Sequence, residues 1–247
     1  MKSKSIWISI IAVIISFIGG FILANAFNRN ELDELRAENS RLKSAPEKSA
    51  QNQSELALTE EEIRQRIAEA DQNPDDFTYQ KNLGLALYRY AAMKQDANLL
   101  TQIEKILRRA NRLNDKDYDV IIALGNLQFD LGYIKKNNEN FAAAREFYAT
   151  ALGQNANDVN VRTDLALTYF LQNPPDNARA VEEFKKSLQI NPKHEKSLLF
   201  IAQALLQIGD KTGAESYLGK LKEVNANAPT LDELQTQTAQ NLSGAQK

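Results

Sequence analysis

The sequence of 247 residues contains no cysteine and a single histidine, His194. Without cysteine the chain forms no disulfide, attaches no haem covalently and offers no thiol as a nucleophile or metal ligand. One histidine, with no HExxH motif, excludes the common zinc-enzyme sites. The sequence also lacks the glycine patterns of phosphate loops, dinucleotide-binding folds and serine hydrolases. We therefore predict a protein that is not an enzyme and that holds no cofactor or metal.

The sequence also has little excess of charge of either sign. Its 30 lysine and arginine residues are opposed by 32 aspartate and glutamate residues, for a net charge of −2. Binding to a phosphate backbone requires a concentrated basic surface. We therefore expect no nucleic acid partner.

A long apolar run stands at the amino terminus. No residue between Lys4 and Arg29 is charged, and residues 6–27 are almost wholly apolar. A helix needs about 20 such residues to cross the hydrocarbon core of a membrane. We predict that residues 1–28 are an uncleaved transmembrane anchor. The alternative is a cleaved signal peptide, because Ala24 and Ala26 match an A-x-A cleavage pattern.

The charges that flank this run are compatible with either orientation in the membrane. Lys2 and Lys4 precede it and Arg29, Arg36 and Arg41 follow it, so a count of basic residues does not decide. We predict that the amino terminus lies on the cytoplasmic side, because the other topology requires the dibasic tail to cross the membrane. We then expect a single-pass protein of a bacterial inner (cytoplasmic) membrane, with its folded part in the periplasm.

Residues 29–43 show the spacing of a short coiled coil. The positions that would form its seam are Leu32, Leu35, Asn39 and Leu42. Leucine at these positions, with one asparagine and oppositely charged flanking residues, favours a parallel dimer in register. We predict a membrane-proximal homodimer, with a short amphipathic helix of chance spacing as the alternative. Residues 44–58 are rich in Ser, Ala, Gln and Asn and are expected to be a flexible linker.

An internal repeat follows the linker. The pairs Leu83-Gly84, Leu124-Gly125, Leu165-Ala166 and Ile201-Ala202 are spaced by 41, 41 and 36 residues. Within the last unit, apolar residues follow helical spacing on both sides of a Gly-Asp break, which indicates two helices. A helical hairpin cannot cover both of its own faces, so successive hairpins must stack. The sequence therefore predicts an all-α fold, an α-solenoid of helix-turn-helix repeats, with an N-terminal transmembrane helix.

The repeats resemble the tetratricopeptide repeat family. The third unit carries the family's small and large residues at their usual spacing, namely Leu165, Ala166, Tyr169, Ala180, Phe184, Ser187 and Pro192. The resemblance covers residues 59–229, read as four repeats after a half-repeat helix in which Thr59 and Glu62 form a capping box. Residues 230–247 are expected to be a capping helix and tail. The first two units hold about seven more residues than the family's repeat, which two extra turns on the first helix or a longer loop would absorb.

The resemblance also implies a binding surface. In the family, equivalent positions of the first helices face a concave groove that binds peptides. In this sequence these positions, with the charged residues at their edge, are Lys81, Leu85, Tyr88, Arg89, Asn126, Phe129, Asp130, Leu167, Phe170, Gln203 and Leu206. The family's clamp for a terminal carboxylate is matched only at Lys81, Asn82 and Asn126, so we expect an apolar or amphipathic protein segment instead. The alternative is that the longer helices bury the aromatic residues in the core.

An aspartate cluster and the single histidine are further candidate sites. Asp115, Asp117 and Asp119 imitate the start of a calcium loop, but Val120 stands where glycine is required, so we expect helix capping instead. His194 follows an Asn-Pro turn and is expected to be an exposed polar residue.

The combination of anchor, linker and repeats predicts a membrane-anchored scaffold or chaperone. This organisation resembles that of accessory subunits of cytochrome c maturation. The resemblance implies that the protein holds an unfolded partner. A structural subunit of an envelope complex is an alternative. An enzyme of unrecognised type is a further one.

Overall fold

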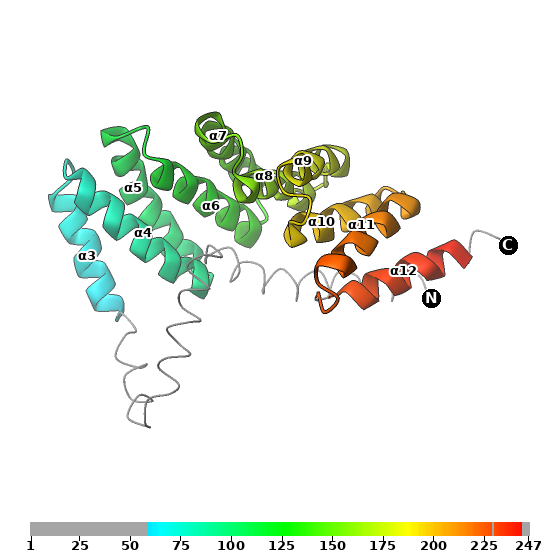
Figure 1. Ribbon diagram of the computed structural model, residues 1–247. Helices are drawn as coiled ribbons and strands as arrows, with labels where there is room; N and C mark the ends of the chain where they lie inside the picture. The colour runs from blue at the N-terminus through cyan, green and yellow to red at the C-terminus, as the bar shows by residue number, and fades with distance from the viewer. Residues whose placement is uncertain (1–58, 229, 244–247) are drawn as a thin grey trace, which may run out of the picture. The chain divides into compact units, whose positions relative to one another are not determined.

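The computed structural model describes residues 59–228 and 230–243, in which the regular elements are α-helices (Figure 1). The predicted anchor (residues 1–28), coiled coil (29–43) and linker (44–58) lie outside the described residues. Among the residues described, no helix is both long and apolar enough to span a membrane. The chain folds as two compact units, Met1–Asn114 and Asp115–Lys247, and each is taken by itself.

The described part of unit 1 contains three helices, α3 (Glu60–Gln72), α4 (Phe77–Lys94) and α5 (Ala97–Leu113). The capping box predicted at the start of α3 is confirmed. The Thr59 backbone N–H donates to Glu62 Oε2 at 2.8 Å, and the Glu62 N–H donates to Thr59 Oγ1 at 3.2 Å. These bonds satisfy N–H groups that have no partner inside the helix.

The carboxyl end of α3 is held against α4 and α5 by two polar side chains. Gln80 has no exposed surface, and its Nε2 donates to the carbonyl oxygens of Ala70 and Asn73 at 2.7 and 2.8 Å. Arg109 of α5 forms an ion pair with Asp71 at 2.6 Å. Because the last carbonyls of a helix lack partners within it, these contacts attach α3 to the hairpin that follows.

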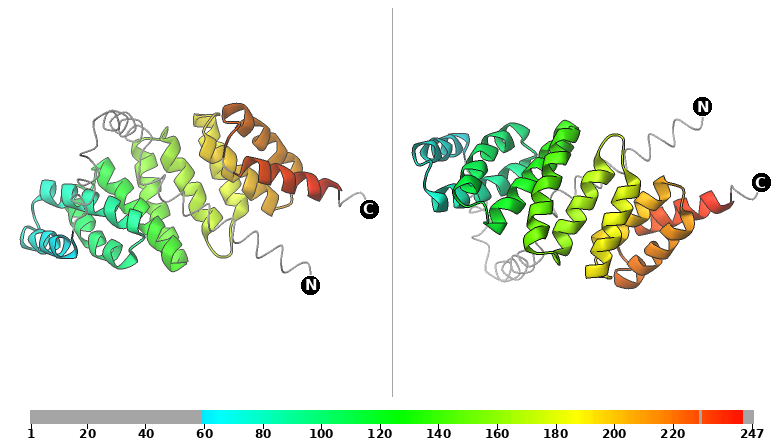
Figure 2. Two further views of the ribbon diagram at one scale, coloured as in Figure 1. Left: turned by 90° about the horizontal axis from the view of Figure 1, so that it is seen from below. Right: turned by 90° about the horizontal axis from the view of Figure 1, so that it is seen from above.

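The described part of unit 2 contains three hairpins and a terminal helix. Its elements are α6 (Tyr118–Lys135), α7 (Asn138–Gln154), α8 (Val159–Leu171), α9 (Asn177–Ile190), α10 (Glu195–Gln207), α11 (Lys211–Val224) and α12 (Leu231–Ser243). Each first helix packs on the second helix of its own hairpin. Successive hairpins are joined by contacts of α7 with α8 and of α9 with α10. The hairpins follow one another in chain order from green to red, as two further views show (Figure 2). The prediction of stacked helical hairpins is confirmed, and α12 packs on α11 as a terminal helix.

The longer repeats accommodate their additional residues in both helices. The first helices α4 and α6 have 18 residues and the second helices α5 and α7 have 17, whereas α8 to α11 have 13 or 14. The extra length is therefore shared between the two helices instead of lying in one helix or in a loop. In the third repeat, α8 ends at Leu171, just before Pro174 and Pro175. Proline cannot donate a helical hydrogen bond, which prevents a longer helix there.

Aspartate side chains begin most of the described helices. Asp117 Oδ1 accepts a hydrogen bond from the Val120 N–H at 3.0 Å at the start of α6, so its expected capping role is confirmed. Aspartates act in the same way at the starts of five other helices, namely Asp76, Asp96, Asp158, Asp176 and Asp210. An aspartate at this position also interacts favourably with the helix dipole.

The expectation that His194 is exposed is wrong. Its exposed fraction is 6%, and its Nδ1 lies 2.9 Å from Ser197 Oγ and 3.2 Å from Thr163 Oγ1. Thr163 Oγ1 in turn lies 2.8 Å from Ser187 Oγ and 2.7 Å from Ser197 Oγ. These four side chains, from α8, α9 and the start of α10, form a buried polar cluster in which each group has a hydrogen-bond partner. The Asn-Pro turn brings the imidazole back against α8, which the local sequence did not indicate.

Candidate functional site

The first helices of unit 2 adjoin one another, since α8 contacts both α6 and α10. Positions that are equivalent in the repeat therefore fall in rows across these helices. One row contains Asn126, Leu167 and Gln203, and the other contains Phe129, Phe170 and Leu206. We call these six residues the first-helix row. The structure thus places these candidates on successive first helices of this unit.

The aromatic members of the first-helix row pack against other rings. The exposed fraction is 1% for Phe129 and 4% for Phe170. The Phe129 ring meets that of Phe141 on α7 edge to face, with centroids 5.6 Å apart. The Phe170 ring meets that of Phe200 on α10 at 5.7 Å in the same way. These rings support the packing of neighbouring helices, and a role in contacting a partner stays a prediction.

The remaining members of the row differ in exposure. Leu167 has no exposed surface, whereas Asn126, Gln203 and Leu206 are half-buried. The Tyr148 hydroxyl donates to Asn126 Oδ1 at 2.8 Å. This hydrogen bond fixes the orientation of the Asn126 amide. The half-buried members thus supply two amides and one leucine side chain. Such groups can bind both the backbone and an apolar side chain of a protein segment.

Charged side chains lie on the same three helices. Lys196 Nζ of α10 lies 2.6 Å from Asp164 Oδ1 of α8, and the exposed fraction is 4% for Asp164 and 3% for Asp130 of α6. Burial lowers the pKa of Lys196, and the two carboxylates partly oppose this effect. Burial raises the pKa of the Tyr148 phenol well above its usual value, and the charges of Asp164 and Asp130 add to the rise. The first helices of unit 2 therefore carry a compact charged group in a region of low dielectric.

Sequence reasoning found Asp130 but missed Asp164 and Lys196. Asp164 stands between Thr163 and Leu165 in an otherwise largely apolar helix, and a charged residue in such a place usually has a partner. That signal could have identified Asp164. Nothing in the local sequence indicates Lys196, because its pairing depends on the contact between α8 and α10.

The candidates of unit 1 all lie on α4. Lys81, Leu85, Tyr88 and Arg89 follow helical spacing, so they share one face of this helix. Tyr88 is buried, Lys81 and Leu85 are half-buried, and Arg89 is exposed. This face is the candidate surface within unit 1.

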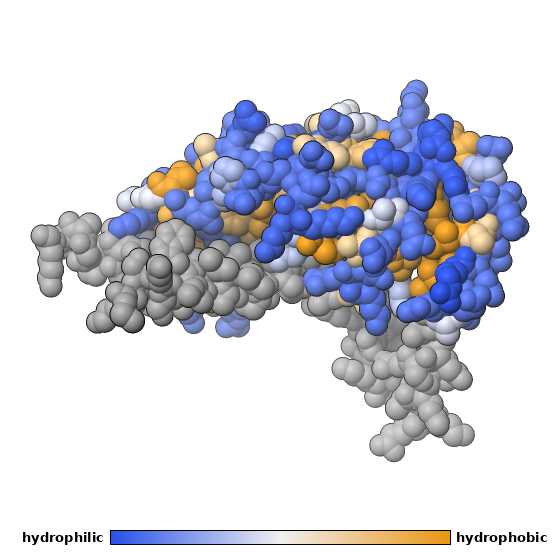
Figure 3. Space-filling model, turned by 180° about the vertical axis from the view of Figure 1, so that it is seen from behind, coloured by the Kyte–Doolittle hydropathy of each residue, from blue (hydrophilic) through white to orange (hydrophobic). Residues whose placement is uncertain are grey.

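The surface seen in Figure 3 is mostly hydrophilic, with apolar side chains visible in narrow strips between polar ones. Broad apolar patches usually mark large permanent interfaces. The apolar strips seen in Figure 3 are narrower than such a patch.

Comparisons with known proteins agree with this architecture. Residues 125–158 and 174–238 match family models described as tetratricopeptide repeat. No curated protein sequence matches the chain significantly. The crystal structure of MamA protein is similar in fold, with a TM-score of 0.52 and 18% identity over 67% of this chain and 81% of that one. YrrB, described as a TPR protein with an unusual peptide-binding site, has a TM-score of 0.42 and 13% identity over 69% and 97% of the two chains.

Proposed function

We propose that the chain is a tetratricopeptide-repeat scaffold that is anchored in a membrane and holds an apolar or amphipathic segment of a partner protein. The proposed contact surface in unit 2 is the first-helix row; within unit 1, taken by itself, the candidate surface is the face of α4 that carries Tyr88 and Arg89. The partner would be held without any chemical change.

The observation that carries this proposal is the alignment of the first-helix row on adjoining helices. Asn126, Gln203 and Leu206 are half-buried there, so a bound segment can reach them without unfolding a helix. The buried rings of Phe129 and Phe170 are held by edge-to-face contacts with neighbouring rings, which restricts their movement. A rigid surface loses little conformational entropy on binding, which favours affinity.

The membrane part of the proposal is supported by the sequence. The apolar run of residues 6–27 has the length and composition of an anchor, and residues 44–58 have the composition of a flexible spacer. A tethered scaffold raises the local concentration of partners near the bilayer. The concrete version that we propose is an assembly factor of the bacterial envelope, such as one that holds an unfolded apoprotein during cytochrome c biogenesis.

Site-specific photo-crosslinking of the full chain in its native membrane tests the contact surface. A photoreactive residue in place of Gln203 or Leu206 is expected to form adducts with partner proteins. The matched control carries the same residue in place of Thr150, which is exposed on the second helix α7. Adducts at Thr150 alone, or equally at all three positions, would contradict the proposal.

The identity of the adducts separates chaperone from structural subunit. Many different unfolded segments would favour a chaperone, and one abundant complex would favour a structural subunit of the envelope. Release of the full chain from membranes by an alkaline carbonate wash would contradict the anchor. Loss of covalent haem bands in a deletion strain, restored by the full chain, would support the specific role in cytochrome c biogenesis.

A further inference from the structure

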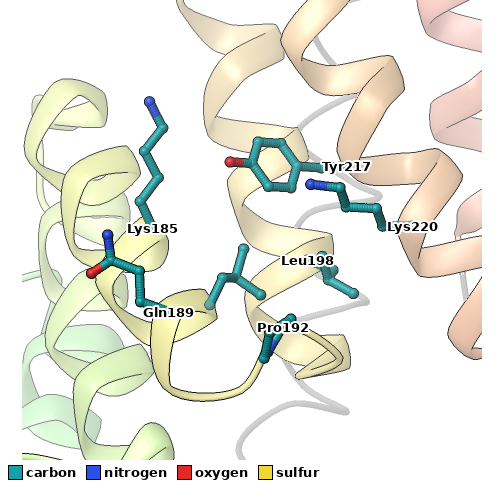
Figure 4. A pocket seen from close by; sticks show the side chains of 7 residues that line it. Lys185, Gln189, Pro192, Leu198, Tyr217 and Lys220 are labelled. Atoms are coloured by element: carbon teal, nitrogen blue, oxygen red, sulfur yellow. The ribbon is translucent and has the colours of Figure 1, made fainter.

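A second surface of unit 2 lies away from the first-helix row, on the second helices α9 and α11. Both helices pack on α10, and a cavity of about 370 Å³ opens between them at the start of α10 (Figure 4). Its apolar lining comes from Leu188 of α9, Pro192 of the turn and Leu198 of α10. Leu198 has no exposed surface and Leu188 very little, so this part of the lining is fixed by the fold. The volume lies within the range of ordinary ligand pockets, about 300–1,000 Å³.

The opening of this cavity is lined by polar and cationic groups. Lys185 and Gln189 stand on α9, and Tyr217 and Lys220 stand on α11 across the opening (Figure 4). The Lys220 ammonium lies 4.9 Å from the centre of the Tyr217 ring, which keeps this charge close to the cavity. Two ammonium groups thus flank the opening from opposite sides.

The charge of these lysines is not cancelled by carboxylates lining the cavity, because none does. The acidic residues of the same turn of α9, Glu182 and Glu183, pair with Lys186 at 2.9 and 2.7 Å. Within the part of the chain that the structure describes, neither Lys185 nor Lys220 forms an ion pair. The charged side chains that line the cavity are therefore both cationic, although the whole chain is slightly acidic.

We propose that this cavity binds an acidic segment of a partner protein. One apolar side chain of the segment enters the cavity, and flanking carboxylates approach Lys185 and Lys220. A simple anion would leave the apolar lining without a contact, and the two lysines disfavour a basic or purely apolar segment. This site is formed by α9, α11 and the start of α10, and none of its lining residues belongs to the first-helix row.

The test is a binding titration of the purified full chain in mild detergent. The probe is a fluorescein-labelled peptide, Gly-Glu-Glu-Leu-Glu-Glu-Gly, and the readout is fluorescence anisotropy. We expect saturable binding that weakens by about fivefold or more in the double variant Lys185→Gln/Lys220→Gln, since each exposed ion pair contributes up to about a fivefold effect. Both side chains are exposed, so the variant should keep the helical circular dichroism of the parent.

A matched double variant, Lys105→Gln/Lys222→Gln, removes the same charge at exposed positions that do not line the cavity. It should change the affinity by less than about twofold. An equal loss in both double variants would overturn the proposal, because net charge alone would then explain binding. Unchanged binding of a peptide with glycine in place of leucine would also overturn it, as would binding to anionic vesicles without binding to the peptide.

Discussion

At the scale of single residues, Gly125 of α6 lies directly against Tyr148 of α7. A Cβ atom added at Gly125 would lie 2.8 Å from the Tyr148 Cε1 atom and 3.3 Å from the Phe147 Cβ atom. Tyr148 has no exposed surface, and its hydroxyl donates to Asn126 at 2.8 Å, so its ring has little freedom to move. The glycine is therefore required by the close approach of the two helices.

The substitution Gly125→Ala is expected to lower the free energy of unfolding by up to about 2 kcal/mol. Overpacking typically costs about 1–3 kcal/mol, and this exceeds the gain of about 1 kcal/mol in helix propensity. Urea unfolding followed by circular dichroism measures the effect. The control is Gly219→Ala in α11, where nothing lies within 4 Å of an added Cβ and a gain of about 0.5–1 kcal/mol is expected. Equal stabilisation by both changes would refute the packing argument.

The buried polar cluster gives a second prediction at this scale. Thr163→Val keeps the shape of the side chain but removes the hydroxyl that lies within 3.2 Å of Ser187, Ser197 and His194. We expect a loss of about 1–3 kcal/mol in stability, because buried groups lose a partner. Thermal and urea unfolding of the full chain measure it.

Ser187→Ala is the matched comparison within the same cluster. Alanine occupies the equivalent position in the two preceding repeats, and the contact between Ser197 and His194 persists without Ser187. Its cost should therefore be the smaller of the two, about 1 kcal/mol or less. If Ser187→Ala proved the more destabilising, the cluster would not be centred on Thr163.

At the scale of elements, the two long hairpins turn through residues with left-handed backbone. Gln95 after α4 has φ of 53°, and Lys136 after α6 has φ of 52°. The fourth repeat places Gly209 at its turn, with φ of 85°. Only glycine adopts this conformation without steric cost, so the long hairpins keep some strain at their turns.

Lys136→Gly is expected to raise the stability of the fold by about 0.5–1 kcal/mol, because it relieves the left-handed conformation. Lys135→Gly removes the same charge one residue earlier, at the last position of α6. There glycine should lower stability by about 0.5–1 kcal/mol. The difference between the two variants in urea unfolding is the measurement, and the same sign for both would argue against relief of strain.

At the scale of the whole molecule, several tyrosines couple stability to alkaline pH. Burial raises the pKa of Tyr118, Tyr133, Tyr148 and Tyr217 above the usual value of 10.0, with Asp158 contributing at Tyr118. The unfolded chain loses these protons near pH 10 while the folded chain keeps them. Stability therefore falls as the pH rises above 10, because the folded state binds more protons there.

Tyr148→Phe should make this fall less steep. A single phenol that stays protonated in the fold contributes a slope that approaches about 1.4 kcal/mol per pH unit above its unfolded pKa. The variant also loses the hydrogen bond to Asn126, so its stability at neutral pH should drop by about 1 kcal/mol. Urea unfolding of parent and variant at pH 7, 10 and 11 measures both effects. Parallel pH profiles would show that Tyr148 ionises in the fold.

Much of the fold could be predicted because it depends on local pattern. The spacing of Gly84, Gly125, Ala166 and Ala202 predicts small residues at helix contacts. The two glycines lie at such close approaches, and the two alanines are fully buried. The start of α3 could be predicted from Thr59 and Glu62 because a capping box involves residues three positions apart. The grouping of the first-helix row also follows from repeat spacing alone.

Other features could not be predicted, because they depend on partners distant in the chain. His194 contacts Thr163, thirty-one positions earlier, and Lys196 pairs with Asp164, thirty-two positions earlier. The sequence therefore suggested an exposed His194 and gave no sign of the charged pair. The division of extra length between both helices of the long hairpins likewise depends on where each helix finds a packing partner.

The sequence by itself determined the repeat, the hairpin and the small residues at helix contacts, because helical periodicity and capping act over a few residues. Only the tertiary structure decided which polar groups are buried and which lie at a surface. Burial depends on the stacking of one hairpin on the next, which brings α8 against α10 and opens the cavity between α9 and α11. Desolvation and ion pairing are consequences of that stacking, so they appear only once the helices are placed in space.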